Sequence, residues 1–104
     1  MPGQKIIRHE IHGQQIRPVG AVNNRTPVGR GDVLVFVPPA GSVSGSVTFD
    51  ASSPFGGNSI SYPATVTVPQ SAAAGVYVYS CLAVGADGVA LSSAGGGEVE
   101  VGNS

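Results

Sequence analysis

Charged residues and cysteine are what this sequence of 104 residues has least of. Only 11% of its residues are charged, less than half the usual share, so hydroxyl, amide and backbone groups must solvate most of the surface. The single cysteine, Cys81, excludes an intramolecular disulfide and a zinc site built from several cysteines of this chain. A run of about eighteen apolar residues is absent too, so we expect no membrane-spanning helix.

Valine, glycine and proline are what the sequence does have. The valines stand in short runs, and clusters rich in the 16 glycines and 8 prolines separate these runs. Because valine favours pleated sheet and the other two residues favour turns, this arrangement is typical of a protein made of strands. We predict strands at Lys5–Ile11, Val33–Val37, Ser42–Asp50, Asn58–Tyr62, Ala64–Val68, Gly75–Val84, Val89–Leu91 and Glu98–Val101.

The segment Gly75–Val84 is the one around which we expect the fold to be organised. Side chains alternate along a strand, so Tyr77, Tyr79 and Cys81 share one face, while valine and leucine dominate the other. A strand that is largely apolar on both faces belongs in the middle of a sheet. We therefore predict a central strand, with Cys81 as a small residue of the core.

These patterns predict one domain over residues 1–104. Several short strands separated by turns are typical of an all-β Greek-key sandwich, and we expect about seven strands and no helix of useful length. The segment 13–30 contains prolines and glycines and shows little alternation, so we predict a long irregular connection there, with a short extended piece at Gln15–Val19.

The charges are divided unevenly along the chain. All five basic residues lie within the first thirty positions, where Glu10 is the only acidic residue, and the remaining acidic residues follow. Four arginines are therefore candidates for contact with an acidic partner: Arg8, Arg17, Arg25 and Arg30. We favour the alternative that the basic segment pairs with the acidic C-terminal strand of the same domain, and nucleic acid is not an expected partner because few aromatic residues accompany the charges.

The possible metal ligands are His9, His12 and Cys81. On a strand, His9 and His12 point to opposite faces, so a site would require a turn and further ligands from elsewhere. We expect the segment His9–His12 to lie on the surface, and we predict no metal and no other cofactor. Catalysis by a nucleophile and a base needs a positioned histidine or paired carboxylates, and we predict no enzymatic activity.

Two segments resemble the cupredoxin family. Gly75–Cys81 resembles the Gly-x-Tyr-x-Tyr/Phe-x-Cys segment that delivers the copper thiolate in those proteins, and Gly31–Val37 is similar to their Gly-Asp-x-Val-x-Phe strand. The resemblance implies a sandwich. It does not carry over the type 1 copper site, which needs two imidazoles and usually a thioether besides the thiolate, because no histidine or methionine follows His12.

A second resemblance is to immunoglobulin-like sandwiches. Ala73–Cys81 resembles the strand of those domains that carries Asp-x-Gly-x-Tyr-x-Cys, and Thr65–Pro69 looks like the Thr-Val-x-Val-Pro segment of bacterial surface modules. This resemblance implies a tyrosine corner, and it favours a secreted or cell-surface location over a cytoplasmic one. The cupredoxin-like and the immunoglobulin-like topology both remain open.

Both resemblances imply a scaffold, so we expect a non-catalytic structural or protein-binding module. Its interaction surface would be a sheet edge or the hydroxyl-rich face of Ser42–Thr48, with the loop Ala51–Ser61 as a second candidate. The low charge and exposed strand edges favour self-association. Two alternatives are an electron-transfer or metal-binding cupredoxin with an atypical site, and a module that binds anions or carbohydrate through the arginines.

Overall fold

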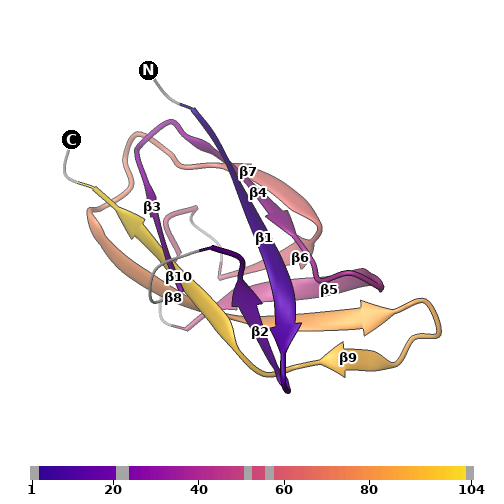
Figure 1. Cartoon of the computed structure of the whole chain (residues 1–104). Coiled ribbons are helices and arrows are strands. Elements are labelled where there is room, and N and C mark those ends of the chain that lie inside the picture. The colour runs from indigo at the N-terminus through magenta and orange to yellow at the C-terminus, as the bar shows by residue number, and fades with distance from the viewer. Residues whose placement is uncertain (1–2, 21–23, 51–52, 56–57, 103–104) are drawn as a thin grey trace.

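The protein is an all-β sandwich of two sheets (Figure 1). The computed structural model describes residues 3–20, 24–50, 53–55 and 58–102, and within them the chain forms ten strands and no helix. No helix in this part of the chain could therefore cross a membrane. The strands are β1 Gln4–His12, β2 Gln15–Pro18, β3 Arg25–Val28, β4 Val33–Val37, β5 Ser42–Phe49, β6 Ser59–Tyr62, β7 Ala64–Thr67, β8 Gly75–Gly85, β9 Ala90–Ser92 and β10 Gly96–Val101.

The two sheets are mixed. The first has the order β2-β1-β4-β7 and the second has the order β3-β10-β8-β5-β6, with β9 paired to β8. Each sheet holds one parallel pair, β1 with β4 and β3 with β10, and all other pairs are antiparallel. The prediction of an all-β sandwich is confirmed, and the long strand β8 lies in the middle of the second sheet as the sequence indicated.

The core lies between the sheets and follows the alternation of the strands. In β4 the side chains of Leu34 and Phe36 are buried, and in β8 those of Tyr79, Cys81 and Ala83 are buried. Aromatic rings fill the middle of this layer, where the centroid of Phe36 lies 5.8 Å from that of Tyr79 and the two rings meet edge to face. The predicted core position of Cys81 is confirmed, because Cys81 is only 3% exposed.

The expected irregular connection over residues 13–30 is wrong in part: β2 confirms the short extended piece predicted at Gln15–Val19, but β3 was not predicted. β2 returns antiparallel along β1 from a turn at Gly13, whose φ of +64° suits glycine. β3 pairs in parallel with β10, which follows some seventy positions later. A strand of four residues that contains a proline has no clear local pattern, and its pairing depends on a distant segment.

The two long sides of the sandwich differ. On the side that we call the closed side, the edge strands are β2, β3 and the short β9, which pairs only with β8. The Ile16 amide there donates to the Ala94 carbonyl at 2.9 Å, so a hydrogen bond links β2 of the first sheet to the segment that precedes β10 of the second. On the side that we call the open side, the edge strands are β6 and β7, and Pro63 alone connects them.

Candidate functional site

A polar cluster lies in the core around His9. We expected this histidine on the surface, but it is only 4% exposed. The reason is the alternation of β1, in which Ile7 and His9 both face the second sheet. The ring of His9 lies between three aromatic rings, with centroid distances of 6.5 Å to Phe36, 5.5 Å to Tyr62 and 5.7 Å to Tyr79.

Hydrogen bonds fix the orientation of the His9 ring. In the tautomer with the ring proton on Nδ1, this nitrogen donates to the Val37 carbonyl, which can only accept and lies 3.3 Å away. Nε2 then accepts from the Tyr79 hydroxyl at 2.8 Å. The Tyr62 hydroxyl oxygen also contacts Nδ1, and its own proton points to the Cys81 Sγ at 3.6 Å. The cluster thus satisfies the polar groups that these four side chains bury.

Burial holds every group of this cluster in its neutral form. It lowers the pKa of His9 to about 4, although the bond to the Val37 carbonyl offsets part of this effect. Burial also raises the pKa of Tyr62 and of Tyr79 far above the usual range, and the neighbouring Cys81 adds to both shifts. The pKa of the Cys81 thiol is raised to about 11 by burial, while the bond from Tyr62 acts in the opposite direction.

The Cys81 thiol should react with thiol reagents only when the domain unfolds. With a pKa of about 11, roughly a thousandth of the thiol is ionised at pH 8, and the surrounding core excludes a reagent. We expect an aromatic disulfide reagent to label the protein within minutes in concentrated urea and to leave the folded protein unlabelled over hours. Labelling at equal rates in the two conditions would contradict a buried thiol.

The structure brings two of the three candidate metal ligands into one cluster. His9 and Cys81 both contact Tyr62, whereas His12 is exposed at the end of β1 and contacts Glu10. Within the residues that the structure describes, no three side chains of His, Cys, Asp or Glu come together as a ligand set. The expectation that the protein has no cofactor stays a prediction.

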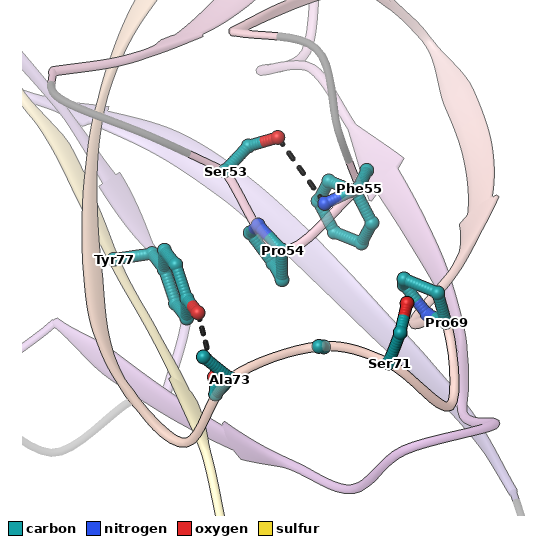
Figure 2. A pocket seen from close by; sticks show the side chains of 8 residues that line it. Ser53, Pro54, Phe55, Pro69, Ser71, Ala73 and Tyr77 are labelled. Carbon is teal, nitrogen blue, oxygen red and sulfur yellow. Dashed lines mark hydrogen bonds between the residues drawn. The ribbon is translucent and has the colours of Figure 1, made fainter.

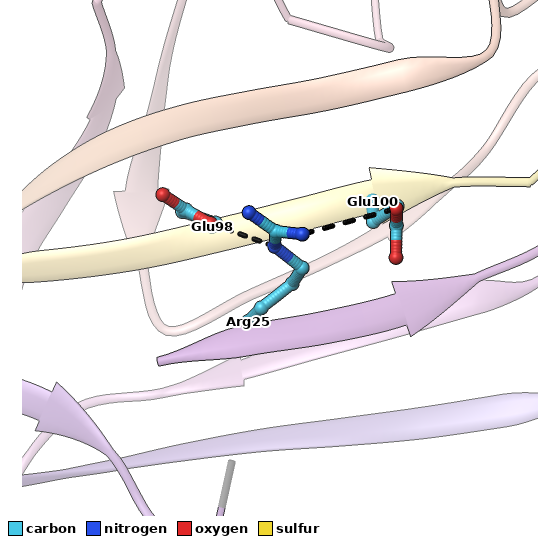
Figure 3. A network of polar contacts seen from close by, with 3 residues as sticks. All are labelled: Arg25, Glu98 and Glu100. Carbon is cyan, nitrogen blue, oxygen red and sulfur yellow. Dashed lines mark hydrogen bonds and ion pairs between the residues drawn. The ribbon is translucent and has the colours of Figure 1, made fainter. Parts of the chain in front are cut away.

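The four arginines lie on different elements. Arg25 of β3 donates from Nε to Glu98 Oε1 at 2.8 Å, and its Nη1 lies 4.0 Å from Glu100 Oε2 (Figure 3). Both glutamates belong to β10, so the pairing that we favoured between the basic segment and the C-terminal strand is found for Arg25. The bond and the charge of Glu98 raise the pKa of Arg25. Strands β1 and β2 carry Arg8 and Arg17.

Arg30, the fourth arginine, precedes β4, and its Nε donates to the Ala72 carbonyl at 2.8 Å. The four arginines therefore come from both sheets and from a connecting segment, and they follow no single strand. Their role as contacts for an anionic partner remains a prediction.

The hydroxyl-rich face predicted for Ser42–Thr48 continues onto neighbouring strands. The register places Thr48 opposite Ser59 of β6 and Ser80 of β8, and Ser46 opposite Ser61 of β6. The hydroxyls of Thr48 and Ser59 lie 3.5 Å apart. We call this surface of the second sheet the hydroxyl face and define it by Ser44, Ser46, Thr48, Ser59, Ser61 and Ser80.

A pocket that sequence reasoning missed opens between Tyr77 of β8 and Pro69, just after β7 (Figure 2). It belongs in part to the loop predicted as a second surface, of which residues 51–52 and 56–57 lie outside the described residues. The Tyr77 hydroxyl donates to the Ala73 carbonyl at 2.6 Å, four positions upstream, whereas Tyr79, which stands two residues before Cys81 as in a tyrosine corner, contacts His9. The described residues that line the pocket are Ser53, Pro54, Phe55, Pro69, Ser71, Ala72, Ala73 and Tyr77.

No model of a known protein family matches this chain, and no characterised protein sequence matches it either. The observations that indicate a function therefore come from the edges, the pocket and the polar cluster of the protein itself.

Proposed function

We propose that the protein is a non-catalytic structural module that binds a protein strand along its open side. The simplest partner is a second copy of the chain, because a free edge of one copy can pair with the same edge of another. The observation that supports this proposal is the contrast between the two sides of the sandwich.

On the closed side, β2 and β3 carry the usual protection against edge pairing, and β9 is only three residues long. β2 contains Arg17 and Pro18, and β3 contains Arg25 and Pro27. Charged side chains and proline at an edge discourage a further strand, because proline has no amide hydrogen and a buried charge is costly. Neither β6 nor β7 contains a charged residue or a proline.

The backbone of the open side also has hydrogen-bonding groups that point outwards. The Val68 amide donates to the Asp32 carbonyl at 2.8 Å, so these two residues form a hydrogen-bonded pair between β7 and β4. Bonded and non-bonded pairs alternate along an antiparallel ladder, so Thr67 and Thr65 belong to non-bonded pairs. The amides and carbonyls of Thr65 and Thr67 therefore point away from β4, where a partner strand could meet them. In the same way, the Phe49 amide donates to the Asn58 carbonyl, so Phe49 and Asn58 form a bonded pair between β5 and β6. The backbone amides and carbonyls of Ser59 and Ser61 therefore point away from β5.

The mixed sheets support the cupredoxin-like alternative for the topology. Immunoglobulin-like sandwiches are built from two antiparallel sheets, whereas parallel pairs join β1 to β4 and β3 to β10 here. A likeness of topology concerns the scaffold alone and assigns no electron transfer.

Two matched lysine substitutions test the binding surface. Thr65→Lys places a charge on the edge strand β7, and Thr48→Lys places the same charge on the hydroxyl face, and both threonines are exposed. Sedimentation velocity over increasing concentration should show self-association of the original protein. We expect Thr65→Lys to weaken it about tenfold or more and Thr48→Lys to leave it unchanged, because only the first hinders edge pairing.

Three results would contradict this proposal. Loss of self-association in Thr48→Lys alone would assign the interface to the hydroxyl face. Equal behaviour of all three proteins would assign it to neither surface. An original protein that stays monomeric up to about 1 mM would exclude a second copy as the partner. Thermal unfolding of both variants should match the original protein, because each substitution is on the surface.

A further inference from the structure

The pocket beside Tyr77 is an open hollow with the volume of a binding site. Its volume is about 440 Å³, which lies within the range of sites that hold small ligands or short peptide segments. Figure 2 shows Tyr77 on one side and Pro69 on the other, with the segment Ser53–Phe55 across the pocket. The lining does not include Thr65 or Thr67, whose backbone amides and carbonyls form part of the proposed strand-binding edge.

The lining indicates what kind of ligand the pocket would take. None of the described residues that line it is charged, and the neighbouring Arg30 guanidinium already donates to the Ala72 carbonyl, so a cation that entered would lose water without gaining a partner. A sugar would bring many hydroxyls, each of which needs a hydrogen bond when it is buried. Only Ser53, Ser71 and Tyr77 of the described lining carry hydroxyls, and the hydroxyl proton of Tyr77 is already donated to Ala73.

What the lining offers instead is a set of rings. Phe55 and Tyr77 are half-buried, and the proline rings of Pro54 and Pro69 accompany them. Grooves lined by aromatic rings bind proline-rich segments in the polyproline II conformation, which is already extended and loses little entropy on binding. Ser71, at the exposed rim, has a hydroxyl that can donate to a carbonyl of such a segment.

The walls of the pocket are also held in place before any ligand binds. The bond from Tyr77 to the Ala73 carbonyl fixes the tyrosine ring. The Phe55 ring packs edge-on against Phe36 and Phe49, with centroid distances of 6.5 Å and 5.8 Å. A preformed site binds more tightly, because its side chains lose less conformational entropy when the ligand binds.

From these observations we propose that the pocket binds an uncharged, proline-rich peptide segment in an extended conformation. The rings of Phe55 and Tyr77 receive the proline rings, and the hydroxyl of Ser71 binds a peptide carbonyl. The pocket therefore defines a second contact with protein, at the end of the sandwich and not along its open side.

Hexaproline with blocked ends is a suitable probe, and amide chemical shifts of the labelled protein are the measurement. We expect shifts confined to the residues around 53–55 and 69–77. Tyr77→Ala should weaken binding about tenfold, whereas Tyr77→Phe, which keeps the ring but loses the bond to Ala73, should weaken it less. Thr65→Lys should bind hexaproline like the original protein, so failure of the edge proposal and failure of this one are distinguishable.

A second pair of variants guards against loss of folding in Tyr77→Ala. Ser71→Trp fills the pocket from an exposed position and should abolish binding, and Gln70→Trp adds the same bulk at an exposed neighbour outside the lining and should not. Three results would overturn the proposal: no shifts with hexaproline, shifts that survive Ser71→Trp, or binding of maltohexaose at these residues in place of the peptide.

Discussion

Replacement of Gly45 by alanine is expected to cost the domain at least about 3 kcal/mol of its free energy of unfolding. Gly45 lies in β5 and pairs with Ala83 of β8 at a φ of +153°, in a region that side chains rarely adopt. A Cβ atom there would lie 1.9 Å from the carbonyl oxygen of Leu82. That oxygen belongs to the backbone of the central strand, so relief requires β5 and β8 to separate.

Gly75→Ala is the matched control for this substitution. Its φ of +150° is nearly the same, but nothing lies within 4 Å of the position that a Cβ would occupy. It therefore bears the conformational strain alone, which we expect to cost about 1–2 kcal/mol. Urea denaturation of both variants measures the difference, and an insoluble Gly45→Ala beside a folded Gly75→Ala would be the extreme form of the expected result. Equal losses would contradict a steric clash between the two strands.

The second large effect is a loss of stability in mild acid. The pKa of His9 is about 4 in the folded protein and about 6.5 in an unfolded chain. As the pH falls below about 6.5, the unfolded chain binds a proton that the folded protein does not bind, so folding loses stability until about pH 4. A difference of this size corresponds to a loss of about 3 kcal/mol. Urea denaturation at several values between pH 4 and pH 7.5 measures it.

Substitutions of the two histidines distinguish the loss of stability caused by His9 from losses caused by other ionisable groups. His9→Gln keeps a hydrogen-bonding side chain but has no proton to gain, so the dependence on pH between 4 and 6.5 should flatten, whatever its cost in stability. His12→Gln is the matched control, because it removes the other histidine of the chain from an exposed position. Backbone bonds from Gly3 and Gly29 lower the pKa of Asp32, so the loss of stability from this carboxylate comes at lower pH. A slope that persists in His9→Gln would assign the acid sensitivity to other groups.

The sequence predicted those parts of the fold whose signal is local. The apolar run of β4 and the two apolar faces of β8 require burial wherever the partner strands lie, so both strands were predicted. β3 was missed because its four residues gain their conformation from a parallel neighbour, β10. The unusual φ of Gly45 has no local signal either, because the close approach of Leu82 causes it.

The candidate sites were predictable to different degrees. The alternation of β1 places His9 on the same face as Ile7 and Ile11, and this signal was sufficient to predict its burial, although the pair of histidines suggested a surface cluster. The convergence of Tyr62 and Cys81 on His9 depends on packing between the sheets. The pocket combines segments about twenty positions apart, and the motif that contains Tyr77 does not indicate that Ser53–Phe55 lies across from it.

Pairing through the open side alone sets a limit on how far an assembly can grow. A protein that binds further copies through two different sides forms open-ended chains. A protein that binds through one side has a valence of one and forms only pairs. If two copies meet along β6 and β7 by two-fold symmetry, the adhesive side of each is used up and growth stops at the pair. Arg17, Pro18, Arg25 and Pro27 on the closed side then serve to prevent fibres, and their removal would raise the valence to two.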